Sequence, residues 1–220
     1  MKTGLSRELI ALRAAKLLTE GMYVNLGIGL PTLVSQFIPL GLEVILHSEN
    51  GILGYGHIAG DDEMDFDLVN AGLQPITLMP GASFFHHADS FAMIRGGHLD
   101  LTFLGGYQVS EKGDLANWMT PQETVGAIGG AMDLVCGSKK VVVLMQHTMQ
   151  SGEPRIVKEC TYPLTGKGVV NSVITDLALI DVTATGLLLK EVAPGITVSD
   201  VQAVTEPELI VSPQLRTMEL

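Results

Sequence analysis

Basic residues are scarce in this chain. Its 220 residues include 13 Lys and Arg against 24 Asp and Glu, which gives a formal net charge of −11 at pH 7. Nucleic-acid binding needs clustered Lys and Arg to neutralise phosphates, so this balance argues against a nucleic-acid partner. From residue 17 to residue 94 there is no Lys or Arg, although Asp and Glu recur throughout that interval. If this half of the chain builds a site for an anionic ligand, the cations must come from elsewhere.

The chain also lacks long apolar runs and paired cysteines. Gly, Pro or charged residues interrupt the apolar stretches before they reach the roughly 20 residues that a membrane-spanning helix requires. Charged residues are mixed into the N-terminal segment, which argues against a secretory signal. We therefore expect a cytoplasmic protein with no membrane partner. Cys136 and Cys160 have no second Cys or His at ligand spacing, so we expect free thiols and no metal site.

The composition is that of an ordinary globular protein. With 46% hydrophobic and 17% charged residues, the chain can bury a sizeable core. No segment rich in Ser, Pro and Gly divides it, so we predict a single domain over residues 1–220. The acidic segment from residue 57 to residue 67 is expected to be a surface loop.

Short apolar runs alternate with segments of helical character. We predict a helix over residues 7–19, with Ser6 as its N-cap and Gly21 just past its end. Apolar runs without polar alternation are typical of strands that are buried on both faces. The pattern therefore predicts an α/β fold with an open, mostly parallel sheet covered by helices on both faces. The predicted strands lie within residues 22–26, 42–48, 75–79, 99–109 and 139–147, the helical segments within 32–39 and 90–98, and a hairpin within 177–195.

Three glycine-bearing loops are expected to leave strand ends and to meet. They cover residues 25–31, 48–54 and 125–133, and ligands of open α/β sheets bind beyond the carboxyl ends of the strands. The middle loop carries Glu49 within "SENGILG". A glutamate at a strand end is in most proteins a solvated side chain, and "GIG" lacks the third glycine of a dinucleotide fingerprint. Spacing alone therefore assigns no role to Glu49.

A carboxylate in such a loop suits covalent catalysis. An ionised glutamate held against a thioester carbonyl can form an acyl intermediate if backbone N–H groups stabilise the oxyanion. Glycines let a ligand approach the main chain and adopt the backbone geometry that points N–H groups toward it. Partial desolvation strengthens the nucleophile but also raises its pKa, so such a site must balance the two effects.

Seven blocks of sequence together resemble a known family. In chain order they are "NLGIGLPT", "SENGILG", "DLVNAG", "FAMIRGGHLDLTFLGG", "GDLANWM", "GGAMDLV" and "YPLTG". They are similar to the β subunit, or C-terminal half, of the family I coenzyme A transferases that act on 3-oxoacids. The resemblance extends in the same order from about residue 22 to about residue 200.

The resemblance implies a mechanism and a set of site residues. Glu49 corresponds to the nucleophile of the family, which forms a mixed anhydride and then a glutamyl-CoA thioester. The backbone N–H of Gly130 would be the oxyanion donor. Coenzyme A esters would be substrates, and no cofactor would be bound permanently. The residues expected around the substrate and CoA are Asn25, Gly27, Gly29, Asn50, Gly51, Gly54 and Gly129.

The resemblance also implies a partner and a choice of substrates. A separate α subunit would supply much of the electropositive surface, in an α2β2 or larger assembly. The donor would be succinyl-CoA or acetyl-CoA and the acceptor 3-oxoadipate or acetoacetate; "HSENG" and "FFHHADSF" favour 3-oxoadipate. Leu73 stands where many relatives carry Lys, which weakens any CoA contact assigned there. An acyl-CoA hydrolase, a sugar-phosphate isomerase and a non-catalytic metabolite-sensing domain are the alternatives.

Several conspicuous residues are expected to be structural. His86 and His87 would face opposite sides of a strand, without a third metal ligand. His98 and His147 are also expected to be structural. Arg95 lies at a predicted helix end, where it complements the helix dipole. Trp118 is expected to pack in the core.

Overall fold

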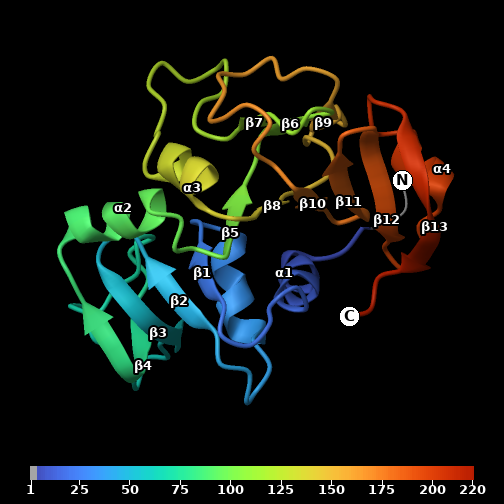
Figure 1. Cartoon of the computed structure of the whole chain (residues 1–220). Helices are drawn as coiled ribbons and strands as arrows, with labels where there is room; N and C mark the ends of the chain where they lie inside the picture. The colour runs from blue at the N-terminus through green and yellow to red at the C-terminus, as the bar shows by residue number, and fades with distance from the viewer. Residues whose placement is uncertain (1–3) are drawn as a thin grey trace.

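A ten-stranded mixed sheet extends through the molecule (Figure 1). The computed structural model describes residues 4–220. The strands are β1 (Tyr23–Leu26), β2 (Ile45–Ser48), β3 (Ile52–Ile58), β4 (Ile76–Phe84), β5 (Leu101–Gly105), β6 (Gln108–Ser110), β7 (Leu115–Ala116), β8 (Val141–Leu144), β9 (Ile156–Val157), β10 (Ser172–Ile174), β11 (Ala178–Thr183), β12 (Gly186–Val192) and β13 (Leu209–Thr217). Their order across the large sheet is β13-β12-β11-β10-β8-β5-β1-β2-β3-β4, and β7-β6-β9 form a separate small sheet.

The centre of the large sheet is parallel. β10, β8, β5, β1 and β2 all run in the same direction. Val24 of β1 pairs with Leu46 of β2 on one side and with Leu101 of β5 on the other, and all three side chains are buried. The predicted parallel sheet is confirmed, because its central strands are the continuous apolar runs that the sequence shows.

Antiparallel strands adjoin both sides of the parallel centre, and the edge strand β13 then pairs parallel with β12. β3 and β4 fold back beside β2 on one flank, and β11 and β12 fold back beside β10 on the other. The predicted hairpin is confirmed as β11 and β12. The prediction of a loop at 48–54 was wrong in its second half, because β3 begins at Ile52. Gly51 and Gly54 suggested a loop, but pairing with β2 and β4 on both sides holds the segment from Ile52 as a strand.

Helices pack on both sides of the parallel centre. They are α1 (Arg7–Ala15), the 3₁₀ helix η1 (Pro31–Phe37), α2 (His87–Arg95) and α3 (Ala131–Gly137). The remaining helix, α4 (Val198–Gln202), lies beside β13 at one end of the sheet. In Figure 1, α2 and α3 lie together on one side of β1 and β5, and α1 and η1 lie on the other. The sequence therefore predicted the layers correctly, although α3 and α4 were not among its predicted helices.

The first helix begins where the sequence predicts and ends earlier. The hydroxyl of Ser6 caps α1 by accepting a hydrogen bond from the N–H of Leu9 at 3.3 Å. The α-helix stops at Ala15 instead of residue 19, because the N–H groups of Leu17 and Leu18 bond to carbonyls three residues earlier. The apolar face of the helix is buried in the main core.

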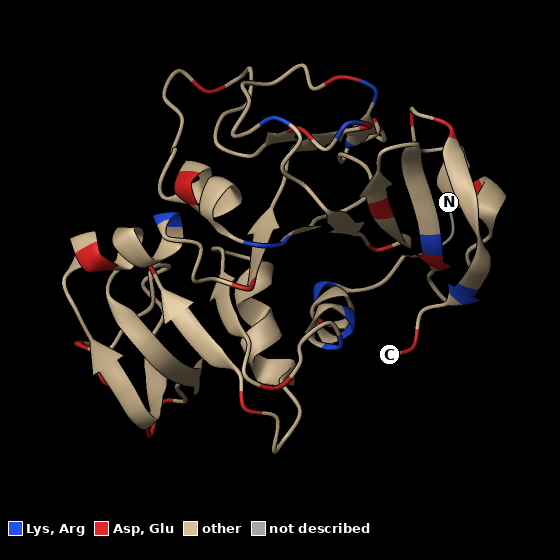
Figure 2. Cartoon of the chain, in the orientation of Figure 1, with Lys and Arg blue, Asp and Glu red and all other residues tan. Residues whose placement is uncertain are grey.

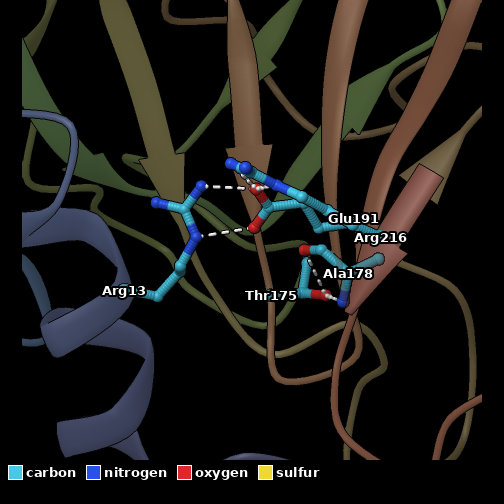
Figure 3. Close-up of polar contacts among 5 residues, drawn as sticks. All are labelled: Arg13, Thr175, Ala178, Glu191 and Arg216. Atoms are coloured by element: carbon cyan, nitrogen blue, oxygen red, sulfur yellow. Dashed lines mark hydrogen bonds and ion pairs between the residues drawn. The ribbon is translucent and has the colours of Figure 1, made fainter. Parts of the chain in front are cut away.

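A buried ion pair joins the first helix to the C-terminal strands (Figure 3). Arg13 of α1 donates two hydrogen bonds to Glu191 of β12, at 2.6 and 2.8 Å. Arg216 of β13 contacts the same carboxylate at 2.8 Å. Burial alone would raise the pKa of Glu191, but the hydrogen bonds from Arg13 and Arg216 outweigh it and hold the pKa below its usual value. Glu191 is therefore ionised, and it connects segments that lie 178 residues apart.

Candidate active site

A cavity of about 480 Å³ opens at the carboxyl ends of the parallel strands. The three loops predicted to meet do meet there: Gly27 and Ile28 come from the first, Glu49 from the second, and residues 127–131 from the third. One part of that prediction was wrong, since the loop at 125–133 does not leave a strand of the parallel sheet. It follows β7 after a long irregular segment and leads into α3.

Glu49 is the first residue after β2, and both its backbone and its carboxylate are held. The side-chain Nδ2 of Asn25, on β1, donates a hydrogen bond to Oε2 of Glu49 at 3.1 Å. His87, at the start of α2, lies with Nδ1 at 2.9 Å from the backbone carbonyl of Glu49. Because a carbonyl only accepts hydrogen bonds, Nδ1 of His87 carries the proton. The strand expected for His86 and His87 was wrong, since His86 caps α2 and His87 begins it.

Gly130 faces the other oxygen of the Glu49 carboxylate. A Cβ atom placed on Gly130 would lie 3.7 Å from Oε1 of Glu49 and 3.1 Å from the ring of Phe91. Gly130 is the N-cap residue of α3, so its N–H precedes the first turn and has no intrahelical partner. The carboxylate thus lies between an asparagine amide and a glycine whose backbone can donate to an incoming group.

A chain of buried polar side chains extends behind Glu49. Nδ2 of Asn25 also lies 3.2 Å from Nδ1 of His47, and Nε2 of His47 lies 2.9 Å from the hydroxyl of Ser90 on α2. Nδ2 can only donate, so Nδ1 of His47 is unprotonated and the ring proton lies on Nε2. Burial lowers the pKa of His47 to about 4, which keeps the ring neutral at physiological pH. This neutral ring orients the Asn25 amide so that its N–H group, and not its oxygen, points to Glu49.

Two arginines of this chain reach the cavity, and neither was among the residues predicted from the sequence. Arg7 precedes the cation-free interval and Arg155 follows it, and both line the same cavity as Glu49. In Figure 2, the strands β2, β3 and β4 carry no basic segment, and the acidic segments of this region lie outside them. The only sequence signal for the two arginines was the requirement that cations come from outside residues 17–94.

The remaining predicted site residues divide into two groups. Gly27 and Gly129 line the cavity, and Gly29 lies beside the Arg7 guanidinium. Asn50, Gly51 and Gly54 do not line it. Asn50 donates to the carbonyl of Val69 at 2.7 Å, and a Cβ on Gly51 would overlap the carbonyl oxygen of Phe85. Asn50 and Gly51 form the turn that follows Glu49, whereas Gly54 lies within β3.

Other conspicuous side chains lie away from Glu49. His147 is buried between the hydroxyls of Thr175 and Thr205, each at 2.8 Å. The ring of Trp118 packs against Gly126, and its N–H donates to the carbonyl of Leu164 at 3.2 Å. Within residues 4–220, no three or more His, Cys, Asp and Glu side chains are grouped in a way that could hold a metal. In the same range, no helix has the length and apolar character needed to cross a membrane.

The two buried histidines are expected to make the fold sensitive to acid. Burial lowers the pKa of His47 and of His147 to about 4, whereas an unfolded histidine titrates near about 6.5. The unfolded chain therefore takes up protons first, so the stabilisation is complete above about pH 6.5 and is lost as the pH falls through about 4. We expect each histidine to account for about 3 kcal/mol of this loss.

Urea unfolding of His147→Gln across this pH range measures that contribution. The free energy of unfolding of the variant should depend on pH less steeply than that of the wild type. His57→Gln is the matched control, because the side chain of His57 is 56% exposed. Equal pH dependence in His147→Gln and the wild type would contradict the expectation.

The sequence comparisons assign the chain to a family. Residues 7–203 match the family described as coenzyme A transferase, and the chain belongs to it. The B subunit of the succinyl-CoA:3-ketoacid coenzyme A transferase of Helicobacter pylori is 54% identical over 202 residues, which cover 92% of this chain and 97% of that protein. The B subunit of the 3-oxoadipate CoA-transferase of Pseudomonas putida is 52% identical over 207 residues, covering 94% of this chain and 97% of that protein.

A solved structure has the same fold. The acyl-CoA transferase YdiF of Escherichia coli O157:H7, solved as a thioester complex with CoA, superposes with a TM-score of 0.78 at 21% identity. The match covers 100% of this chain and 44% of that one. At this level of identity the similarity concerns the fold, and the fold predicted from the sequence agrees with it.

Proposed function

We propose that the chain is the catalytic β subunit of a coenzyme A transferase that moves CoA from an acyl-CoA donor to a 3-oxoacid. The observation that carries the proposal is the position of the Glu49 carboxylate, fixed by Asn25 and facing Gly130 in the cavity. The names of the relatives at 52 to 54% identity supply the substrate class.

The first half of the reaction transfers CoA to the protein. A carboxylate oxygen of Glu49 attacks the thioester carbonyl carbon, the C–S bond breaks, and its electron pair leaves with the CoA thiolate. The product is a mixed anhydride between Glu49 and the donor acid. The thiolate then attacks the Glu49 carbonyl carbon and expels the donor acid as a carboxylate, which leaves a glutamyl-CoA thioester.

The second half reverses these steps with the acceptor. The carboxylate of the 3-oxoacid attacks the glutamyl thioester and releases the thiolate, which then attacks the acceptor carbonyl and frees the Glu49 carboxylate. In this proposal the N–H of Gly130 donates to the oxyanion at each attack. Asn25 keeps the carboxylate oriented between attacks. In each half the released thiolate is consumed in the next step, and the donor acid leaves as a carboxylate, so water has no part in the reaction.

An α subunit completes the site in this proposal. CoA carries several phosphate charges, whereas β2, β3 and β4 are without basic residues (Figure 2). Two findings support a partner of comparable size: the match covers 44% of the YdiF chain, and the bacterial relatives are themselves named as B subunits. An α2β2 or larger assembly is the form we propose. Full turnover by this chain alone would contradict the need for an α subunit.

The acceptor and the location are further parts of the proposal. The acceptor is 3-oxoadipate or acetoacetate, as the names of the two relatives suggest. Comparison of turnover with these two acids identifies it directly. A cytoplasmic location remains a prediction.

The proposal is tested by trapping the intermediate. The chain is co-expressed with its α subunit and mixed with succinyl-CoA without acceptor, and CoA covalently attached to Glu49 is sought by peptide mass spectrometry. A transferase shows the adduct and returns CoA to an added acceptor. A hydrolase releases free CoA and acid without acceptor, and a sensor binds the ester reversibly, so either result contradicts the proposal.

Gly130→Ala is expected to slow turnover without unfolding the chain. The backbone of Gly130, at φ −88°, accepts an alanine, but the new methyl group would crowd Phe91 and the Glu49 carboxylate. We expect kcat to fall by about 10- to 100-fold, less than the roughly 100- to 1,000-fold that loss of an oxyanion donor costs, because the N–H is kept. Gly105→Ala is the matched control, because Gly105 lines the same cavity and a Cβ there meets nothing within 4 Å. Equal rates in the two variants would contradict a role for the Gly130 position.

A further inference from the structure

Arg155 is held on a rigid part of the backbone beside the cavity. It directly precedes β9, its N–H donates to the carbonyl of His147 at 3.1 Å, and its carbonyl accepts from Val109 at 2.9 Å. Arg155 lines the cavity that contains Glu49. The backbone that carries its guanidinium is therefore fixed at the edge of this cavity.

The guanidinium of Arg155 leaves one edge without hydrogen bonds. Nη1 donates to the carbonyl of Gly106 at 3.1 Å. Nε is buried without a partner, and no partner is found for Nη2 among the described residues. Burial raises the pKa of the nearby Asp176, and the charge of Arg155 only partly offsets this effect. Asp176 accepts from the N–H of His147 at 2.7 Å, and no ion pair joins it to Arg155 among the described residues. An unmade hydrogen bond to a buried charged group is costly, and a ligand that supplied the acceptor would recover that cost.

The same protein shows what this edge binds. Arg13 uses Nε and Nη2 to hold both oxygens of Glu191, at 2.6 and 2.8 Å. Arg95 likewise donates from Nε to a carboxylate, that of Asp133, at 2.7 Å. The unpaired edge of Arg155 has the donor pattern that a carboxylate satisfies with two parallel hydrogen bonds.

We propose that Arg155 forms a carboxylate subsite that selects acyl groups with a second, distal carboxylate. This inference rests on the proposed function, because it places an acyl-CoA with its thioester at Glu49. A long pantetheine arm separates the thioester of CoA from its phosphates, so a cation that shares the cavity with the nucleophile meets the acyl group. Arg155 thus favours dicarboxylic acyl groups, such as succinyl or 3-oxoadipyl, over monocarboxylic ones.

The test compares two donors that differ in the distal carboxylate. Succinyl-CoA and butyryl-CoA have acyl chains of the same length, and kcat/KM is measured for each with the assembled enzyme. We expect the wild type to prefer succinyl-CoA by on the order of 100-fold, the effect of one charged, bidentate contact. Arg155→Gln should remove that preference by lowering kcat/KM for succinyl-CoA while leaving the value for butyryl-CoA within about threefold.

Two further variants keep the test decisive. Arg155→Lys retains the charge without the planar pair of donors, so we expect a preference between those of wild type and Arg155→Gln. It also replaces Arg155→Gln if that variant does not fold. Lys190→Gln is the control, since it removes one surface charge on β12, away from the cavity. An unchanged succinyl preference in Arg155→Gln, or an equal loss for both donors, would overturn the proposal.

The carboxylate subsite and the proposed function fail in different ways. If CoA never becomes attached to Glu49 of the wild type with either donor, the proposed function is wrong. If the adduct forms but Arg155→Gln still discriminates between the donors, only the carboxylate subsite is wrong.

Discussion

Glu49→Gln is expected to abolish CoA transfer while the protein stays folded. The amide has nearly the same shape but is no nucleophile, so neither the anhydride nor the glutamyl thioester can form. We expect turnover to fall by about 10⁴-fold or more, and the covalent CoA adduct to disappear from mass spectra. Asn25 provides the one side-chain hydrogen bond that the Glu49 carboxylate receives in the described structure. The free energy of unfolding should therefore change by less than about 1 kcal/mol.

A second glutamate provides the control for this loss. Glu43→Gln makes the same chemical change a few residues earlier, outside the cavity lining. It should leave both turnover and adduct formation within about twofold of the wild type. Glu49→Ala should behave like Glu49→Gln. Residual transfer within about tenfold of the wild type in either Glu49 variant would contradict the assignment of the nucleophile.

Arg13→Met is expected to destabilise the whole chain. The side chains of Arg13 and Glu191 are only 6% and 4% exposed, and they are joined by two hydrogen bonds. Removal of the arginine leaves a buried carboxylate that Arg216 only partly compensates. Breaking such a pair lowers the free energy of unfolding by about 3–5 kcal/mol. This is a large part of the roughly 5–15 kcal/mol that stabilises a typical domain. Urea unfolding at neutral pH measures this loss directly.

The second arginine on the same carboxylate is a matched comparison. The side chain of Arg216 is 62% exposed, so in Arg216→Met water replaces most of the interaction that the guanidinium made with Glu191. That variant should lower the free energy of unfolding by less than about 1 kcal/mol. Joining Arg13→Met to Glu191→Leu should recover part of the loss, because no unpaired buried charge then remains. The expectation is wrong if Arg13→Met is no more destabilising than Arg216→Met.

Much of the central sheet could be predicted because its residues face the same environment on both sides. Strands β1, β2, β5 and β8 have neighbours on both sides, and most of their buried side chains are apolar, so they stand out as apolar runs in the chain. Asn25 and His47 are buried polar exceptions. The segment of β3 was missed for the opposite reason. Its glycines have turn propensity, and only pairing with both neighbouring strands makes it extended.

The candidate site shows the same division. The strand-end position of Glu49 and the approach of the three loops follow from parallel topology, in which carboxyl ends of strands meet at one edge. The contacts of Glu49 with Asn25 and Gly130 join positions far apart in the chain, and no local pattern encodes them. His87 was expected in a strand, yet it begins a helix and holds the Glu49 backbone.

The amino-acid sequence by itself determined the class of fold, the family resemblance and the residue types available for chemistry. The class of fold could be predicted because buried faces of strands and helices need apolar residues at regular positions, and that spacing is visible in the sequence. The tertiary structure alone decided which cations reach the cavity and which buried groups are left without partners. Arg7 and Arg155 lie 148 residues apart in the chain, outside the region that carries Glu49, yet both line its cavity. Contacts of that kind depend on how distant segments pack, and packing is a property of the whole chain that no local stretch of sequence specifies.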